Sequence, residues 1–311
     1  MSKSRYNIIT RSPSKEGLPF CPVWINPDYM LAVQNLHNCE AKQLVCYKGD
    51  EIKAVMPIYE KKKLGISYII CPVSSYYQGL WFYNLEKRGE NRRLLDELNI
   101  SSEIAIWLNA HYKRMQFKLM PENYDVRGFT WKNYKAKPLY TFTYNFQEPL
   151  KLSYDEKKRL IKASTYNYQL DEQFLPDEFI HLLKILYQRI NKNLGLSYNA
   201  FQNWMEDLYR HNLLSQFNLR REGKVVSSNI VLGGKEDNRA YSILLSTLPE
   251  EMKNGASIVH YLSFIESLRG RFDKIDFCGG NTPDVARFKA AMGFKLELFF
   301  IIEKLEVLWI K

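Results

Sequence analysis

One supersecondary pattern occurs twice in this sequence, and it limits the possible folds more than any other feature. In residues 42–71 an apolar strand reaches a turn at Lys48-Gly49-Asp50, and an alternating strand follows. A lysine-rich turn ending at Gly65 then leads to a third apolar strand. This order of strand periods and turn residues predicts a three-stranded antiparallel meander.

The same order returns in residues 215–246, with turns at Glu222-Gly223-Lys224 and at the stretch GGKEDN. The turn glycines Gly49 and Gly223 are 174 residues apart, which is more than half of the 311-residue chain. A chain of this length favours two domains of about 150 residues each. The repeat therefore predicts a duplicated domain, with one copy in residues 1–150 and the other in 151–311.

Helices and further strands are expected after each meander. A proline-containing loop, CPVSSYYQGLWF (71–82), precedes a predicted helix at about 90–113, and residues 254–270 carry an apolar stripe at helical spacing. Asn254 is the expected N-cap of that second helix. A linker helix is expected within 148–168. A helix pair follows, whose predicted core stripe is Leu182, Leu183, Leu186 and Ile190.

The stretch DFCGGNTPDVARFKAAMGFK (276–295) holds a strand end, two glycines and a helix start. Thr282 is the expected cap, and Pro283 occupies the first helical position. The buried face of this short helix is predicted to be Val285, Phe288 and Met292, with Gly293 ending the helix before a last strand.

Composition places the chain among globular proteins, because 46% of its residues are hydrophobic and 25% are charged. No apolar run is long enough to span a bilayer, and the N-terminal stretch lacks the apolar core of a signal peptide. We therefore expect a cytoplasmic protein without a transmembrane segment, for which peripheral membrane contact is compatible. The net charge of +10 favours anionic partners, although a solvated surface is favoured over a dedicated nucleic-acid patch.

The sequence contains neither the ligand spacing of a metal site nor the serine motif of a hydrolase. The five cysteines form no CxxC pair, and the five histidines show no metal-ligand spacing. The cysteines are expected to be reduced and structural, with Cys278 as the exception to watch. No G-x-S-x-G stretch occurs.

The order of these elements resembles a GNAT-type acyltransferase domain, and two such domains in tandem resemble the FemABX-like branch of that superfamily. The matching stretches are YSILLSTLPEEMKNGASIVHYLSFIESL, DFCGGN and FKAAMGF in the second half, and CPVSSYYQGLWF and VRGFTWKNYKAKPLYTFTYNF in the first. The resemblance covers about residues 40–303. It implies an α/β (α+β) protein of two tandem GNAT-like folds, each a mixed, mostly antiparallel sheet flanked by helices.

The resemblance also implies a function, namely transfer of an acyl or aminoacyl group to an amine. The acceptor it suggests is a small molecule, a nucleotide-linked sugar or another precursor in cell envelope biogenesis. Acyl-CoA or aminoacyl-tRNA would be the co-substrate, so tRNA is a candidate partner and DNA is not. No tightly bound cofactor is expected.

Candidate site residues follow from matching positions. The pair Phe288 and Lys289 corresponds to an active-site pair in peptidoglycan-building relatives, where the lysine is thought to stabilise the tetrahedral intermediate. Aminolysis develops an oxyanion, and a cation in a dry site stabilises it. A solvated Lys289 and a purely structural Gly279-Gly280 turn are the alternatives. The predicted substrate-binding residues are Tyr76, Tyr77, Gln78, Gly79, Gly279, Gly280 and Asn281.

The expected cofactor-binding residues are Asn254, Gly255 and Ala256, which stand where ordinary GNAT enzymes have a glycine-rich pyrophosphate loop. The stretch PEEMKNGAS departs from that loop, since it holds one glycine and two glutamates that would repel a pyrophosphate. A non-catalytic nucleotide- or RNA-binding module, or a scaffold in envelope assembly, is the alternative function on the same fold.

Overall fold

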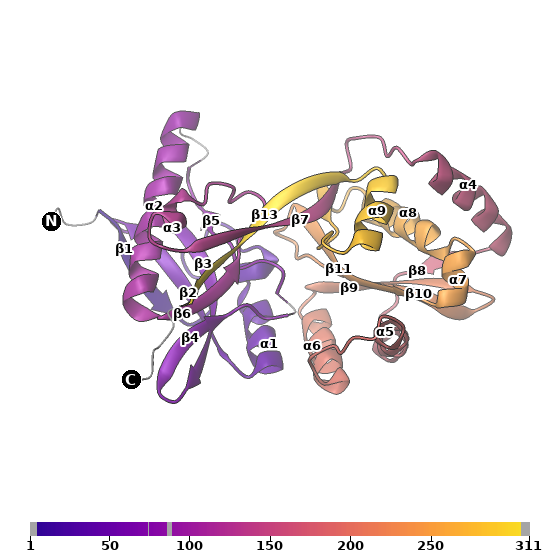
Figure 1. Ribbon diagram of the computed structural model, residues 1–311, viewed down its shortest axis with the longest axis horizontal. Helices are drawn as coiled ribbons and strands as arrows, with labels where there is room; N and C mark the ends of the chain where they lie inside the picture. The colour runs from indigo at the N-terminus through magenta and orange to yellow at the C-terminus, as the bar shows by residue number, and fades with distance from the viewer. Residues whose placement is uncertain (1–4, 74, 86–88, 306–311) are drawn as a thin grey trace. The chain divides into compact units, whose positions relative to one another are not determined.

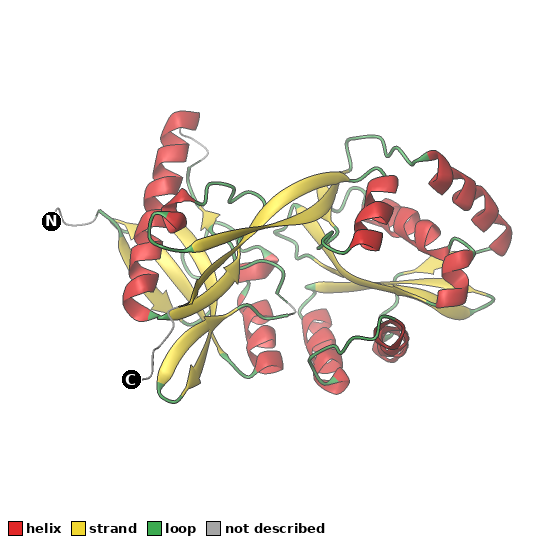
Figure 2. Ribbon diagram, in the orientation of Figure 1, coloured by secondary structure: helices red, strands yellow, loops and turns green. Residues whose placement is uncertain are grey.

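Both predicted meanders are present as antiparallel strands in the computed structural model, which describes residues 5–73, 75–85 and 89–305 (Figures 1 and 2). The first consists of β2 (Glu40–Lys48), β3 (Glu51–Lys63) and β4 (Ile66–Ile70). The second consists of β9 (Leu214–Arg221), β10 (Lys224–Leu232) and β11 (Arg239–Thr247). The duplication inferred from turn spacing is thus confirmed as a repeated strand order.

The chain forms two compact units. Unit 1 comprises Met1–Leu139 and Leu298–Lys311, and unit 2 comprises Tyr140–Glu297. The C-terminal segment of the chain therefore belongs to unit 1, although unit 2 lies between the two segments of unit 1 in the sequence. The division into domains 1–150 and 151–311 stays a prediction.

Unit 1 is built on strands in the order β1-β2-β3-β4-β6-β13, with β5 paired to β3. Its remaining elements are β1 (Asn7–Arg11), η1 (Val23–Ile25), α1 (Pro27–His37), β5 (Trp81–Phe82), α2 (Glu90–His111), β6 (Arg114–Lys118) and α3 (Arg127–Thr130). Helix α2 packs on the core through Ile100, Ile104 and Leu108, which recur every four residues and are fully buried. Strand β13 (Lys295–Leu305) adds Ile301–Leu305 antiparallel to β6.

Unit 2 contains the order β7-β12-β11-β10-β9-β8, in which β12 runs parallel to β11. The other elements are β7 (Lys135–Asn145), α4 (Tyr154–Ala163), η2 (Ser164–Tyr166), β8 (Gln169–Asp171), α5 (Pro176–Arg189), α6 (Tyr198–Arg210), α7 (Pro249–Lys253), α8 (Ala256–Leu268), β12 (Lys274–Asp276) and α9 (Pro283–Ala291). Helices α5 and α6 cover one face of the sheet, and α8 covers the other (Figure 1).

Three details of the helix predictions are wrong. Asn254 does not cap α8; it ends the unanticipated short helix α7, and Gly255 takes the N-cap position of α8. Ile190 is 43% exposed, because α5 ends one residue earlier. On α9, Val285 is 42% exposed and the buried side chain is Lys289, which pattern reading treats as polar and outward.

A buried polar network links α8 to the sheet of unit 2. His260 on α8 is fully buried, and its Nδ1 lies 2.7 Å from the Ser227 hydroxyl of β10. Ser227 Oγ lies 2.7 Å from Thr247 Oγ1 of β11. Burial lowers the pKa of His260 to about 3, because the imidazolium would lose its hydration.

This histidine makes stability depend on pH. Its folded-state pKa lies below the unfolded value of about 6.5, so its contribution is complete above pH 6.5 and is lost as pH falls towards 3. Relative to a His260→Asn variant, we expect the wild type to lose about 2 kcal/mol of unfolding free energy between pH 7 and pH 5. Urea titrations at the two pH values measure this difference. A difference that stays constant with pH would contradict a neutral, buried imidazole.

Candidate active site

The loop between β12 and α9 is fixed at its start by a buried carboxylate. Asp276, at the end of β12, has no exposed surface. Its Oδ1 accepts a hydrogen bond of 2.6 Å from the hydroxyl of Thr141 on β7 and one of 2.8 Å from the amide of Cys278. The guanidinium of Arg239 lies 3.8 Å from Oδ2. These contacts indicate a structural role for Asp276.

The loop then takes a backbone course that few residues adopt. Cys278 has φ of 45° and Gly279 has φ of 116°, both in the region where a Cβ is disfavoured. The amide of Gly279 donates to Thr141 Oγ1 at 3.2 Å. A Cβ on Gly280 would lie 2.7 Å from the ring of Phe142, so the second glycine is required by packing. The loop is therefore held against β7 by Thr141 and Phe142.

Lys289 reaches into this loop from α9. Its side chain is only 4% exposed, and its Nζ donates hydrogen bonds of 2.6 Å to the Phe277 carbonyl and 2.5 Å to the Gly279 carbonyl. The strained backbone at 278–279 brings both carbonyls to one side of the ammonium. The alternative of a solvated lysine is thus excluded by its burial.

Burial changes the acid–base behaviour of this lysine. Loss of hydration lowers the pKa of Lys289 to about 8, although the nearby Cys278 and Asp276 act in the opposite direction. The side chain is therefore still mostly protonated at pH 7. An ammonium carries three N–H donors, and the two carbonyls use two of them. The remaining donor belongs to a cation that is already dehydrated and held in place.

Aromatic rings surround the base of α9. Phe288 is half-buried and packs edge-on against Tyr261, with ring centroids 5.4 Å apart. Phe277 stacks on Phe294 at 4.0 Å. The contact with Tyr261 gives Phe288 a role in packing, and its predicted catalytic role stays a prediction.

The other predicted residues of this loop are used within the protein. Asn281 is exposed, and its side-chain amide pairs with both backbone groups of Tyr140, at 2.9 Å in each direction. The backbone amides of Cys278 and Gly279 donate hydrogen bonds to the side chains of Asp276 and Thr141. The loop therefore turns its carbonyl groups, and not these amides, towards Lys289. Substrate binding by Gly279, Gly280 and Asn281 stays a prediction.

The predicted substrate residues of unit 1 lie in the loop after β4. Tyr77 is buried between Trp24 and Phe299, with ring centroids 5.6 and 5.4 Å away. Gln78 is also buried, and its amide nitrogen donates to the Ile70 carbonyl at 3.1 Å. Tyr77 and Gln78 therefore serve the packing of unit 1.

Tyr76 and Gly79 flank these two residues. The half-buried Tyr76 has the Lys118 ammonium 5.4 Å above its ring. A Cβ on Gly79 would lie 2.5 Å from Asn123 Oδ1, so a side chain is excluded there. Tyr76 is the member of this set whose ring is partly open, and the binding role of the whole loop stays a prediction.

The three residues expected to bind a cofactor form a closed turn between α7 and α8. Asn254 Nδ2 donates to the Glu251 carboxylate at 3.3 Å. A Cβ on Gly255 would lie 2.9 Å from the Ala163 side chain, so α4 packs directly on the start of α8. Ala256 is fully buried. Their role in cofactor binding stays a prediction. The Glu251 carboxylate beside this turn is buried and also accepts hydrogen bonds from Tyr168 and Arg221.

Sequence reasoning missed Thr141, whose hydroxyl connects Asp276 to the amide of Gly279. It stands about 135 residues before the loop, and no local pattern links the two. No group of three histidine, cysteine or acidic side chains that could hold a metal occurs among the described residues. None of the helices in the described part of the chain is long and apolar enough to cross a membrane.

Comparison with solved structures identifies the fold. FemX superposes with a TM-score of 0.62 over 88% of this chain and 90% of its own, at 11% identity. L-PGS from Bacillus licheniformis gives 0.54 over 88% and 87%, at 12% identity. A tandem GNAT protein from the clavulanic acid biosynthesis pathway gives 0.50 over 96% and 98%, at 10% identity. No family model and no curated protein sequence matches the chain.

These likenesses confirm the fold class expected from the sequence, because they extend over nearly the whole of each chain. The chain thus has the tandem GNAT-like architecture, with mixed, mostly antiparallel strands flanked by helices.

Proposed function

We propose that this protein is an N-acyltransferase or aminoacyltransferase. It would move an acyl group from an activated donor, acyl-CoA or aminoacyl-tRNA, to an amine on a nucleotide-linked sugar or cell-envelope precursor. The observation that carries the proposal is the buried ammonium of Lys289, held by the Phe277 and Gly279 carbonyls. It occurs on the fold shared with FemX and a tandem GNAT protein.

The chemistry needs a fixed positive charge. The acceptor amine attacks the carbonyl carbon of a thioester or ester, and the C=O electron pair moves onto oxygen. The tetrahedral intermediate then collapses, forming the amide and expelling a thiolate or alkoxide, and the proton lost by the nitrogen neutralises that leaving group as a thiol or alcohol. The third N–H of Lys289 can donate to the transient oxyanion, and donors that need no reorganisation are the most effective ones.

The loop around Lys289 supplies that preorganisation. Asp276 and Thr141 fix the backbone, and the backbone carbonyls fix the ammonium. The carbonyls are neutral dipoles, so they orient the cation without cancelling its charge, as a carboxylate partner would. The positive charge therefore remains available to the reaction.

The turn at 254–256 bears on which donor we propose. Ala163 and the Arg159 carbonyl cover Gly255, and the Glu251 carboxylate lies beside Asn254. These contacts favour a donor whose phosphates rest elsewhere on the protein. Between the two donors, they support aminoacyl-tRNA over acyl-CoA bound at the start of α8.

A transfer assay tests the proposal. The purified protein is incubated with either acetyl-CoA or a mixture of aminoacyl-tRNAs and with a panel of amines, including amino sugars and nucleotide-linked amino sugars. We expect an amide product, detected by its mass, with one donor class. A folded protein that yields no amide with either donor, yet binds RNA with a steep salt dependence, would replace the proposal with the nucleic-acid-binding alternative.

A further inference from the structure

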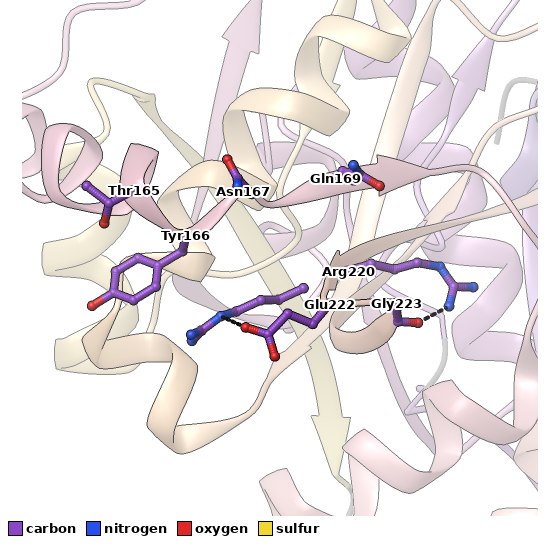
Figure 3. A pocket seen from close by; sticks show the side chains of 8 residues that line it. Thr165, Tyr166, Asn167, Gln169, Arg220, Glu222 and Gly223 are labelled. Atoms are coloured by element: carbon purple, nitrogen blue, oxygen red, sulfur yellow. Dashed lines mark hydrogen bonds and ion pairs between the residues drawn. The ribbon is translucent and has the colours of Figure 1, made fainter.

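A second polar site lies in unit 2, on a different loop from Lys289. An open pocket of about 360 Å³ lies between two segments of this unit (Figure 3). One runs from the end of α4 into β8, and the other from the end of β9 into the turn before β10. Thr165, Tyr166, Asn167 and Gln169 form one side. Arg220, Arg221, Glu222 and Gly223 form the other.

Both arginines of the pocket are held in place from behind. Arg220 donates through Nε to Asp171, through Nη1 to the Gly223 carbonyl at 3.0 Å and through Nη2 to Gln173 Oε1 at 3.4 Å. Arg221 donates through Nη1 to Glu251 at 2.9 Å, and its guanidinium lies over the Tyr166 ring at 4.7 Å. Arg220 is thereby held through all three of its nitrogens, whereas Arg221 is anchored through Nη1 alone. Anchoring reduces the entropy lost when the remaining N–H groups bind a ligand.

The open side of the pocket is rich in donors. A guanidinium has five N–H groups, so the bonds above leave two on Arg220 and four on Arg221, of which Nε faces Glu222. The exposed side chains of Asn167 and Gln169 add amide donors. Preorganised, charged N–H donors around a small cavity suit an oxyanion, and arginine binds phosphate through paired N–H groups.

We propose that this pocket is a binding site for a phosphate group, seated on the open edge of Arg221 and the two remaining N–H groups of Arg220. The site does not depend on the transfer reaction proposed above. A phosphate has three or more acceptor oxygens, which match the number of donors better than the two oxygens of a carboxylate.

Glu222 acts as an internal competitor at this site. Its carboxylate lies 3.6 Å from Arg221 Nε, and its side chain is 82% exposed. A phosphate that takes the same N–H group displaces this carboxylate into solvent, where its hydration compensates for the lost ion pair. Removing the charge of Glu222 should therefore strengthen phosphate binding, and adding a negative charge at Asn167 should weaken it.

Isosteric variants of exposed residues test the site without disturbing the core. Asn167 has φ of 47°, a conformation that aspartate also tolerates. Inorganic phosphate is titrated at low salt and followed by ³¹P line broadening, with the wild type, Asn167→Asp and Glu222→Gln. We expect saturable binding by the wild type, about tenfold weaker binding by Asn167→Asp, and severalfold tighter binding by Glu222→Gln.

Matched controls lie elsewhere in unit 2. Asn191 is exposed with φ of 49°, so Asn191→Asp adds the same charge on the same backbone conformation. Glu178 is exposed on α5, and Glu178→Gln removes a charge away from the pocket. Both controls should bind phosphate like the wild type. If the control variants changed the phosphate affinity as much as the pocket variants do, the effect would come from net charge alone, and the proposed site would be wrong.

Two further comparisons define the ligand. Acetate at equal ionic strength should bind more weakly than phosphate, and equal affinity would overturn the phosphate assignment. Glycerol phosphate distinguishes a phosphate ester from the free ion as the preferred form, and both results keep the phosphate assignment. No saturation of the wild type by about 10 mM phosphate would also overturn it.

Discussion

Replacing Lys289 by methionine should lower the rate of acyl transfer at least hundredfold. Methionine keeps an unbranched apolar stem but removes the ammonium that is held by the Phe277 and Gly279 carbonyls. Loss of one preorganised oxyanion donor typically costs a hundredfold or more in rate, about 2.7 kcal/mol of transition-state stabilisation. Steady-state kinetics with the donor and acceptor found in the transfer assay measure the effect.

Stability must be measured for the same variant. The two carbonyls lose a buried donor, which costs about 1–3 kcal/mol, although the variant also avoids burying a charge. Arg287→Met is the matched control, because Arg287 is two residues away on α9 and its side chain is 80% exposed. It should retain full activity. A folded Lys289→Met protein with the same kcat as Arg287→Met would remove Lys289 from the mechanism.

The pH dependence of the rate supplies an independent test. The pKa of Lys289 is lowered to about 8, so the stabilising charge is present below that pH and is lost above it. We expect kcat to fall as pH rises through about 8. The Lys289→Met variant should lack this descending limb.

Replacing Gly293 by alanine should destabilise the protein by about 3–4 kcal/mol. Gly293 ends α9 with φ of 81°, where a Cβ costs about 1 kcal/mol. The added methyl group would also meet the backbone of Lys151, with the carbonyl carbon at 2.9 Å and the nitrogen at 3.2 Å. Backbone atoms cannot rotate aside as a side chain can, so overpacking adds a further 2–3 kcal/mol.

Gly270→Ala separates these two contributions. Gly270 has φ of 78° in the same unit, and a Cβ there would have no neighbour within 4 Å. Its substitution should cost only the conformational part, about 1 kcal/mol. Urea unfolding of both variants gives the comparison. Equal losses would show that the Lys151 segment yields without cost and that packing at Gly293 is looser than the structure indicates.

Sequence patterns determine much of this fold because the meanders depend on local signals. The turns at Gly49 and Gly223 and the alternating strands beside them lie within 30 residues, and both meanders were predicted with nearly the observed bounds. The N-cap of α8 failed for a local reason as well. Two helices meet at Asn254 and Gly255, and a polar residue between them can end the first or begin the second.

The candidate site could be predicted only in part. Phe288 and Lys289 were identified through the resemblance to an active-site pair of the FemABX-like branch, but helical periodicity put Lys289 on the polar side of α9. Its burial depends on the carbonyls of a loop with unusual φ values, and those depend on Thr141 and Asp276. Such a chain of contacts between distant segments leaves no periodic pattern in the sequence.

The strand pairing of unit 1 has a consequence for synthesis on the ribosome. Residues 301–305 of β13 pair with β6, and they follow β6 by about 180 residues. At roughly 5–20 residues per second, the edge of β6 waits about 10–40 s for its partner, while all of unit 2 emerges. Unit 1 is therefore translated first but completed last. During that interval the exposed edge of β6 is a site where a chaperone that binds unpaired strands could act.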